Sequence, residues 1–63
     1  MTAKALDDRV IRAIRRVPDQ RADEIAERLG EPTVDVRRSL YRLKNARRVR
    51  TSGVKRGTTY RAT

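Results

Sequence analysis

Arginine is the residue type whose number and spacing in this chain could do chemistry, and that chemistry is the binding of anions. The 63 residues include 17 Lys and Arg, of which 14 are Arg, against 8 Asp and Glu, so the formal net charge is +9. A guanidinium group is planar and makes bidentate hydrogen bonds with phosphates and with the edges of bases. The composition therefore indicates a polyanionic partner, and nucleic acid fits this geometry.

The charge surplus lies in the C-terminal half of the chain. Residues 1–34 have seven basic and seven acidic groups, whereas residues 35–63 have ten basic groups against Asp35 alone. A genome with GC-rich codons would account for part of the excess of Arg over Lys, but it would not account for this asymmetry. We therefore expect the C-terminal half to face the anion while the N-terminal half supports it.

Other kinds of chemistry have few residues to carry them out. The chain has no Cys and no His, which removes disulfides, thiolate metal sites and the commonest general base. Three aspartates are imaginable as catalytic carboxylates, but nothing in the sequence supplies a pocket or a partner for them: Asp7, Asp8 and Asp19. Three further acids are better explained by stabilisation of a helix dipole and by ion pairing than by a metal site: Asp23, Glu24 and Glu27. We expect no enzymatic activity, no metal and no cofactor.

Membrane and export signals are also missing from the sequence. No apolar run approaches the roughly 20 residues that span a bilayer. Residues 1–20 lack the apolar core of a signal peptide. We therefore expect a cytoplasmic protein without a membrane partner.

The spacing of apolar residues predicts three helices in a single domain over residues 1–63. Apolar side chains recur every three or four positions in segments 3–17, 22–29 and 33–46. Thr2 is the predicted N-cap of the first helix, and Pro18 disfavours its continuation. Gly30 supplies the positive φ that often follows a helix. Val36, Leu40 and Leu43 form the buried stripe of the third helix.

After Ala46 the pattern changes to one that favours strands. Val49 to Ser52 and Thr58 to Arg61 are β-prone, and Gly53 and Gly57 enclose a basic loop between them. We predict a β-hairpin over about residues 49–62, with Tyr60 packed into the core. The fold class is then mainly α with a small β-hairpin.

The order of these elements and their residues resemble small bacterial and phage winged helix-turn-helix DNA-binding proteins. The segment "ADEIAERLGEPTVDVRRSLYRLKNARRVR" is similar to one that such regulators share, a helix ending in Leu-Gly, a turn, and a helix running Val-Arg-Arg-x-Leu-x-x-Leu. The segment "SGVKRGTTYRA" resembles their wing. The resemblance covers residues 6–62 and implies a winged helix-turn-helix of three helices plus a C-terminal wing.

The chain departs from the pattern of that family in three places. Arg21 stands where Ser or Thr usually caps the second helix, so this cap is weak unless Gln20 replaces it. Glu31 stands where an apolar residue often anchors the turn. Arg47 and Arg48 stand where the family usually has Gly-Leu, between the third helix and the wing. Asn45 or Arg47 must therefore adopt the left-handed backbone geometry that Gly normally supplies.

The outer face of the third helix is the expected DNA-contacting surface, because the major groove admits one α-helix. Arg38 and Arg42 lie one turn apart on this face, and Arg can pair with guanine, whereas Asn45 can pair with adenine. The full expected set on this helix is Thr33, Arg37, Arg38, Tyr41, Arg42 and Asn45. The expected set on the wing and its flank, against backbone or minor groove, is Arg47, Arg48, Arg50, Lys55, Arg56 and Arg61.

Two residues of the third helix keep two interpretations each. Tyr41 either contacts phosphate or sugar, or packs against the base of the wing. Val34 either contacts a thymine methyl group or packs onto the second helix.

We expect a double-stranded DNA-binding protein, either a transcription regulator or a nucleoid-associated silencer. It would act in the cytoplasm, on the nucleoid, as a monomer or weak homodimer. The alternative is a winged-helix module that binds a protein partner or RNA. The sequence predicts no aromatic platform for stacking RNA bases, and a protein partner would need to be acidic to match the charge of +9.

Overall fold

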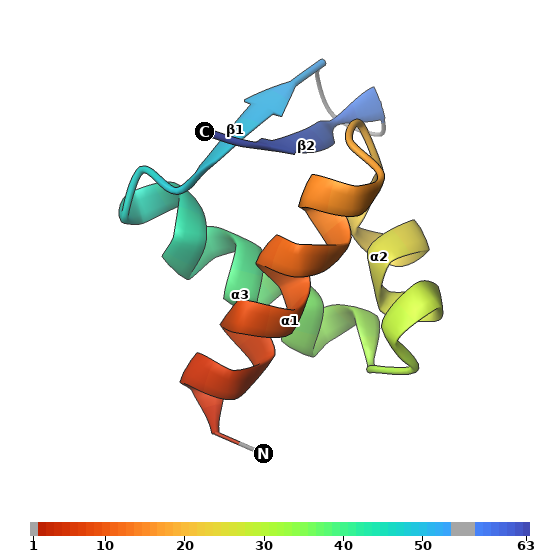
Figure 1. Ribbon diagram of the computed structural model, residues 1–63. Helices are drawn as coiled ribbons and strands as arrows, with labels where there is room; N and C mark the ends of the chain where they lie inside the picture. The colour runs from red at the N-terminus through yellow and green to blue at the C-terminus, as the bar shows by residue number, and fades with distance from the viewer. Residues whose placement is uncertain (1, 54–56) are drawn as a thin grey trace.

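The computed structural model describes residues 2–53 and 57–63, which form three helices and a two-stranded hairpin (Figure 1). The elements in chain order are α1 (Ala3–Arg16), α2 (Ala22–Leu29), α3 (Thr33–Asn45), β1 (Val49–Ser52) and β2 (Thr59–Ala62). The hairpin lies over the end of the bundle at which α1 and α3 finish (Figure 1). Within the described residues, no helix is long and apolar enough to cross a membrane.

The core lies where the three helices meet, and each helix contributes one apolar stripe. Five of its side chains are less than 2 % exposed: Val10, Ile14, Ile25, Val36 and Leu40. Val49 of β1 is buried with them, and Tyr60 of β2 packs against the cluster, as the sequence predicted. The hairpin is thereby held to the helices by apolar contacts at its base.

The turn between α1 and α2 adds a bridge to the hairpin that the sequence did not predict. β1 and β2 pair antiparallel in a register that places Arg50 opposite Arg61 and Thr51 opposite Tyr60. Tyr60 also bonds with the turn, because its N–H donates to the Gln20 carbonyl and its carbonyl accepts from Asp19 N–H, both at 3.0 Å. This backbone bridge fixes the position of β2 relative to the helices.

Gln20 is buried and fills three hydrogen-bonding roles at this turn. Its amide nitrogen donates to the carbonyls of Val17 at 2.7 Å and Ala13 at 3.3 Å, at the C-terminal end of α1. Its amide oxygen accepts from Arg28 Nε at 3.2 Å. Burial of an amide group costs free energy unless the group is hydrogen-bonded. These contacts therefore explain how Gln20 can be buried, with only 5 % of its surface exposed.

The helix ends follow the local sequence closely, with two small differences. Thr2 caps α1 by accepting from Ala5 N–H at 3.1 Å, as predicted. α1 ends at Arg16 rather than 17, because Pro18 forces Val17 into extended geometry. α3 ends at Asn45 rather than 46, because the chain turns directly into a left-handed residue.

That left-handed residue is Arg47, one of the two positions predicted to adopt this geometry. Its φ is 59°. The N–H of Arg48 then reaches back to the Leu43 carbonyl at 2.9 Å, which closes the end of α3.

The other two departures from the family pattern are compensated by side chains. The Glu24 carboxylate accepts from Arg21 N–H at 2.8 Å, so the start of α2 is capped from within the helix and not by Gln20. Glu31 accepts from Arg9 Nη1 at 2.9 Å, so an ion pair ties the α2–α3 turn to α1 where the family has an apolar contact.

Candidate nucleic-acid interface

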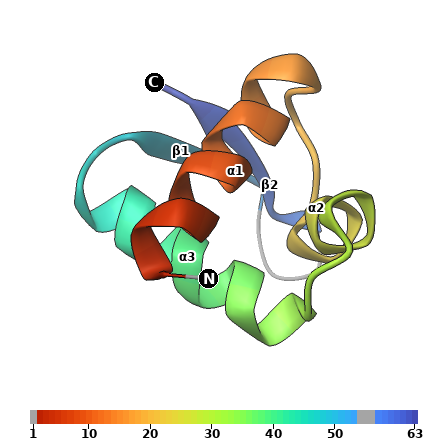
Figure 2. The same ribbon diagram turned by 60° about the horizontal axis from the view of Figure 1, so that its bottom comes forward.

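The side of α3 that faces away from the core carries the exposed residues of the predicted DNA-contacting set. Val36, Leu40 and Leu43 are buried against α1 and α2, which lie above α3 in Figure 2. Thr33 is half-buried at the start of the helix. The other five members are exposed: Arg37, Arg38, Tyr41, Arg42 and Asn45.

Tyr41 and Val34 both project into solvent. Their exposed fractions are 69 % and 55 %. Such exposure is inconsistent with packing of Tyr41 against the wing base or of Val34 onto α2, the structural alternatives that the sequence left open. An aromatic ring and an aliphatic side chain therefore accompany Arg38 on the basic face.

Arg42 is held by an ion pair, although the helix periodicity places it beside Arg38. Its Nη2 donates to Asp7 Oδ1 at 2.7 Å, and its Nε donates to Asp7 Oδ2 at 3.2 Å. This bidentate pair joins α3 to α1 at the edge of the exposed face. Arg42 therefore lies in a fixed position on the α1 side of α3, whereas no such bond holds Arg38 among the described residues.

Asp7 is the centre of a small network that includes a fully buried hydroxyl. Ser39 donates its hydroxyl to Asp7 Oδ1 and is 0 % exposed. Burial by itself would raise the pKa of Asp7. Hydrogen bonds from Arg42 and Ser39, together with the charges of Arg42 and Arg48, outweigh that effect and hold the pKa below its ordinary value.

On the hairpin, Arg61 is also paired with a carboxylate. Its Nε and Nη2 donate to the two oxygens of Asp19, each at 2.8 Å. The hydrogen bond from Arg61 is the main reason that the pKa of Asp19 lies below its ordinary value. Arg50 lies directly opposite Arg61 in the register, and both side chains are exposed.

The connection between α3 and β1 carries two further exposed arginines. The backbone at Arg47 and Arg48 is held by Thr63, because Thr63 Oγ1 donates to the Arg47 carbonyl at 2.8 Å and Thr63 N–H donates to the Arg48 carbonyl at 3.1 Å. The predicted wing-tip residues Lys55 and Arg56 lie outside the described residues.

The geometry gathers positive charge along the chain from α3 to the hairpin. No acidic residue occurs after Asp35. Among the described residues, two carboxylates reach this half from elsewhere, and each pairs with one arginine: Asp7 with Arg42 and Asp19 with Arg61. The other described arginines of this half keep their charge available to a polyanion.

No group of three acidic side chains that could hold a metal ion occurs within residues 2–53 and 57–63. Two of the acids considered for such a site have local roles at the start of α2. Glu24 bonds Arg21 N–H, and Asp23 accepts from Glu24 N–H at 3.0 Å.

Three residues that organise this surface were not among the residues that the sequence analysis assigned to it. Asp7, Asp19 and Ser39 meet their partners across 32 to 42 positions of chain, beyond any local spacing rule. Ser39 did carry a signal, because it lies three positions after Val36 and four before Leu43, so that a polar group falls on the core stripe. A polar group in that position requires a partner.

Comparison with known proteins gives one informative match. No family model matches the chain, and no curated protein matches it. Among solved structures, the chain is similar to the Zalpha domain of Carassius auratus PKZ, solved in complex with Z-DNA, with a TM-score of 0.88 and 21 % sequence identity over 97 % of each chain. The fold is a winged helix-turn-helix. In this fold α3 is the third helix and the β1–β2 hairpin is the wing.

Proposed function

We propose that this winged-helix domain binds double-stranded DNA through the outer face of α3 and through the wing. The observation that carries the proposal is the exposed arginine set on α3 and its flank, in a chain half with ten basic groups and one acid. The resemblance of the sequence to bacterial and phage winged-helix regulators supports it. The likeness of the fold to a domain solved with Z-DNA supports it as well.

The residues of this surface would divide into two kinds of contact. Arg38 and Asn45 are exposed and lie on the side of α3 that could enter the major groove, so we assign base contacts to them. Arg37, Arg42 and the arginines between α3 and β1 would bind phosphates, which position the protein without specifying sequence. Tyr41 would contact phosphate or sugar.

A transcription regulator and a nucleoid-associated silencer both remain consistent with this surface. A charge of +9 on 63 residues favours the second role, because much of the affinity would come from phosphates and would depend little on sequence. We place the protein in the cytoplasm, on the nucleoid, as a monomer or weak homodimer. Competition of one selected duplex against random duplex DNA distinguishes the two roles.

A left-handed duplex is the second candidate ligand. The specific observation in its favour is that the similar Zalpha domain was solved in complex with Z-DNA. An alternating dC-dG duplex in its right-handed and left-handed forms, distinguished by circular dichroism, tests this form directly. Preference for the left-handed form would replace the major-groove assignment of α3.

The decisive experiment is a fluorescence-anisotropy titration of the full chain at low salt. The ligands are AT-rich, GC-rich and random duplexes, single-stranded DNA and RNA. We expect the duplexes to bind more tightly than the single strands. Absence of binding to every nucleic acid would reject the proposal and make an acidic protein partner the leading alternative.

A further inference from the structure

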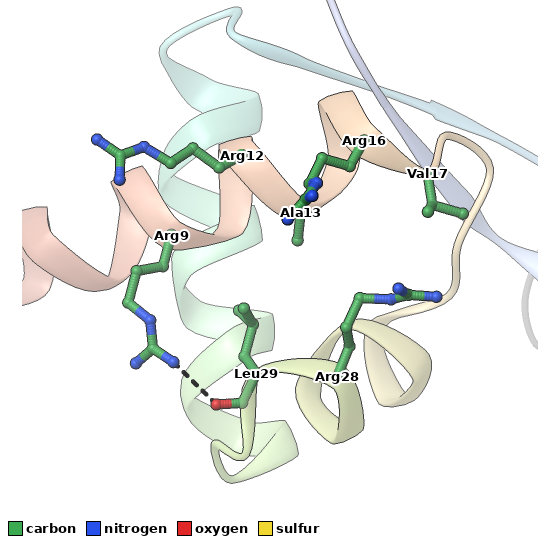
Figure 3. A pocket seen from close by; sticks show the side chains of 7 residues that line it. All are labelled: Arg9, Arg12, Ala13, Arg16, Val17, Arg28 and Leu29. Carbon is green, nitrogen blue, oxygen red and sulfur yellow. Dashed lines mark hydrogen bonds between the residues drawn. The ribbon is translucent and has the colours of Figure 1, made fainter.

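A groove between α1 and α2, away from the proposed DNA-binding surface, is lined by arginines around an apolar floor (Figure 3). Its volume is about 540 Å³. α1 contributes Arg9, Arg12 and Arg16, which recur at spacings of three and four and therefore share one side of the helix. Arg28 comes from the end of α2.

The arginines at the two ends of the groove are fixed by the fold. Arg9 Nη2 donates to the Leu29 carbonyl at 2.9 Å, the bond drawn in Figure 3. Arg28 Nε donates to the buried Gln20 side chain at 3.2 Å. Arg9 is also paired with Glu31, so its charge is already used within the fold. The Arg28 guanidinium is held in place before any ligand arrives, which lowers the entropy lost on binding.

The two arginines along the α1 side of the groove are exposed. Arg12 and Arg16 lie one turn apart, and neither makes an ion pair within the described residues. Asp8 lies four positions before Arg12 on α1, but these two side chains form no ion pair. Both guanidinium groups can therefore pair with an incoming anion.

The floor distinguishes this groove from a simple basic patch. It is formed by Ala13, Val17 and Leu29. Val17 is 36 % exposed, and Leu29 is half-buried, so hydrocarbon remains accessible between the arginines. A DNA backbone would use the guanidinium groups and leave this floor unused, whereas a peptide could fill it with an aliphatic side chain.

We propose that the α1–α2 groove binds an acidic peptide segment of a protein partner, with carboxylates on Arg12, Arg16 and Arg28 and an aliphatic side chain on the floor. The volume lies within the range of ordinary ligand sites. The chemistry is that of an amphipathic segment laid in a groove. Because α3 presents its buried stripe to α1 and α2, the groove and the outer face of α3 are separate surfaces, so one molecule can bind peptide and DNA together.

The test uses the full chain and a defined probe, a blocked synthetic peptide that alternates Glu and Leu. Amide chemical shifts map the bound site, and calorimetry at low salt gives the affinity. A Glu-Ser peptide tests the floor, and a Lys-Leu peptide tests the charge. We expect shifts along α1 and α2, with the Glu-Leu peptide binding about tenfold more tightly than the Glu-Ser peptide.

A pair of variants with equal net charge separates this site from a general charge effect. Arg12→Ala with Arg16→Ala should weaken peptide binding about tenfold, because two charge-assisted pairs are lost. The matched control, Arg37→Ala with Arg38→Ala on α3, should leave peptide binding nearly unchanged. Duplex DNA should show the opposite ranking.

Three results would overturn the proposal. The first is that the peptide shifts amide signals of α3 and the wing instead of those of the groove. The second is that the two double variants weaken peptide binding equally, and the third is that the Glu-Leu and Glu-Ser peptides bind with equal affinity. None of these results depends on DNA binding, which the duplex titration measures separately.

Discussion

Arg38 and Arg42 lie one turn apart on α3 but differ in what holds their side chains. Arg38 is exposed, with no ion pair among the described residues, so its guanidinium can reorient toward a base edge. Arg42 is fixed through Nε and Nη2 to Asp7. A fixed arginine loses little conformational entropy when it binds, but it cannot move far to find its partner. This difference favours a base contact for Arg38 and a phosphate contact for Arg42.

Alanine substitution at these two positions should therefore separate binding from stability. Arg38→Ala should weaken binding to a preferred duplex by about 1–3 kcal/mol and relax preference at one base pair, with an unchanged melting temperature. Arg42→Ala should lower both affinity and melting temperature, because it leaves Asp7 with the Ser39 hydroxyl but without its charged partner. Anisotropy and thermal melting measure the two effects. Equal melting temperatures for the two variants would show that the Asp7 pair does not stabilise the fold.

The lowered pKa values of Asp7 and Asp19 predict that stability falls in acid. A carboxylate whose pKa is lower in the folded state stabilises the fold at all pH values above its unfolded pKa, near 4. As the pH drops below that value toward the folded pKa, the unfolded chain takes up the proton first and the stability is lost. We expect the melting temperature to be flat from pH 7 to about 5 and to fall below about pH 4.

The double variant Asp7→Asn with Asp19→Asn tests this origin. It should begin at a lower melting temperature near neutral pH and show a shallower fall in acid than the wild type. Parallel curves for variant and wild type would assign the acid effect to other groups.

At the scale of elements, α3 is positioned by its buried stripe and by the two helices that cover it. Leu40 is 1 % exposed at the centre of that stripe. Leu40→Ala should cost about 2–5 kcal/mol through the lost contacts and the cavity left behind. A domain of this size has only about 3–9 kcal/mol of stability in total, so much of the population should unfold.

The neighbouring Tyr41 gives a matched control for that substitution. Because Tyr41 is 69 % exposed, Tyr41→Ala should change the urea midpoint little. Circular dichroism during urea titration measures both variants. Similar midpoints for Leu40→Ala and wild type would contradict the assignment of Leu40 to the core.

The wing depends on the backbone conformation at Gly53. Its φ is +84°, and an added Cβ would collide with the carbonyl oxygen of Gly57. Gly53→Ala should therefore disturb the strand pairing. Gly57→Ala is the control and should leave the pairing intact, because a Cβ at Gly57 would meet nothing nearby. Amide exchange at Arg50 and Arg61, which lie opposite each other in the register, reports the effect, because the Tyr60 N–H bonds Gln20 and not β1. Equal protection in the two variants would refute this role of Gly53.

The elements were largely predictable from the sequence because their signals are local. Helical periodicity, Thr2, Pro18 and Gly30 act within a few residues and mark where α1 and α2 begin or end. The bridge from Gln20 to Tyr60 and the pair of Asp7 with Arg42 join positions far apart in the chain. Their formation depends on the packed helices, so no spacing pattern could reveal them.

At the scale of the whole molecule, 63 residues must form the apolar core and also carry a net charge of +9. The radius of gyration is 10.2 Å, so the described basic groups of the C-terminal half lie close together. These positive charges repel one another, and the ion pairs of Asp7 with Arg42 and of Asp19 with Arg61 reduce the repulsion at two points. A bound polyanion would reduce the repulsion further, so binding should stabilise the folded state.

This charge density predicts a steep dependence of DNA affinity on salt. If four to six phosphates are neutralised, log K should fall against log salt with a slope of about −4 to −5, because each contact releases condensed counterions. Titrations of one duplex at several salt concentrations give the slope for wild type. The variant with Arg37→Ala and Arg38→Ala should have a slope smaller in magnitude by about 1, because only Arg37 of this pair is assigned to a phosphate, whereas the groove variant with Arg12→Ala and Arg16→Ala should keep the wild-type slope. A wild-type slope near −1 would show that the charged half of the chain is not the binding surface. An equal reduction in the two variants would show that charge acts from the whole surface and not from α3.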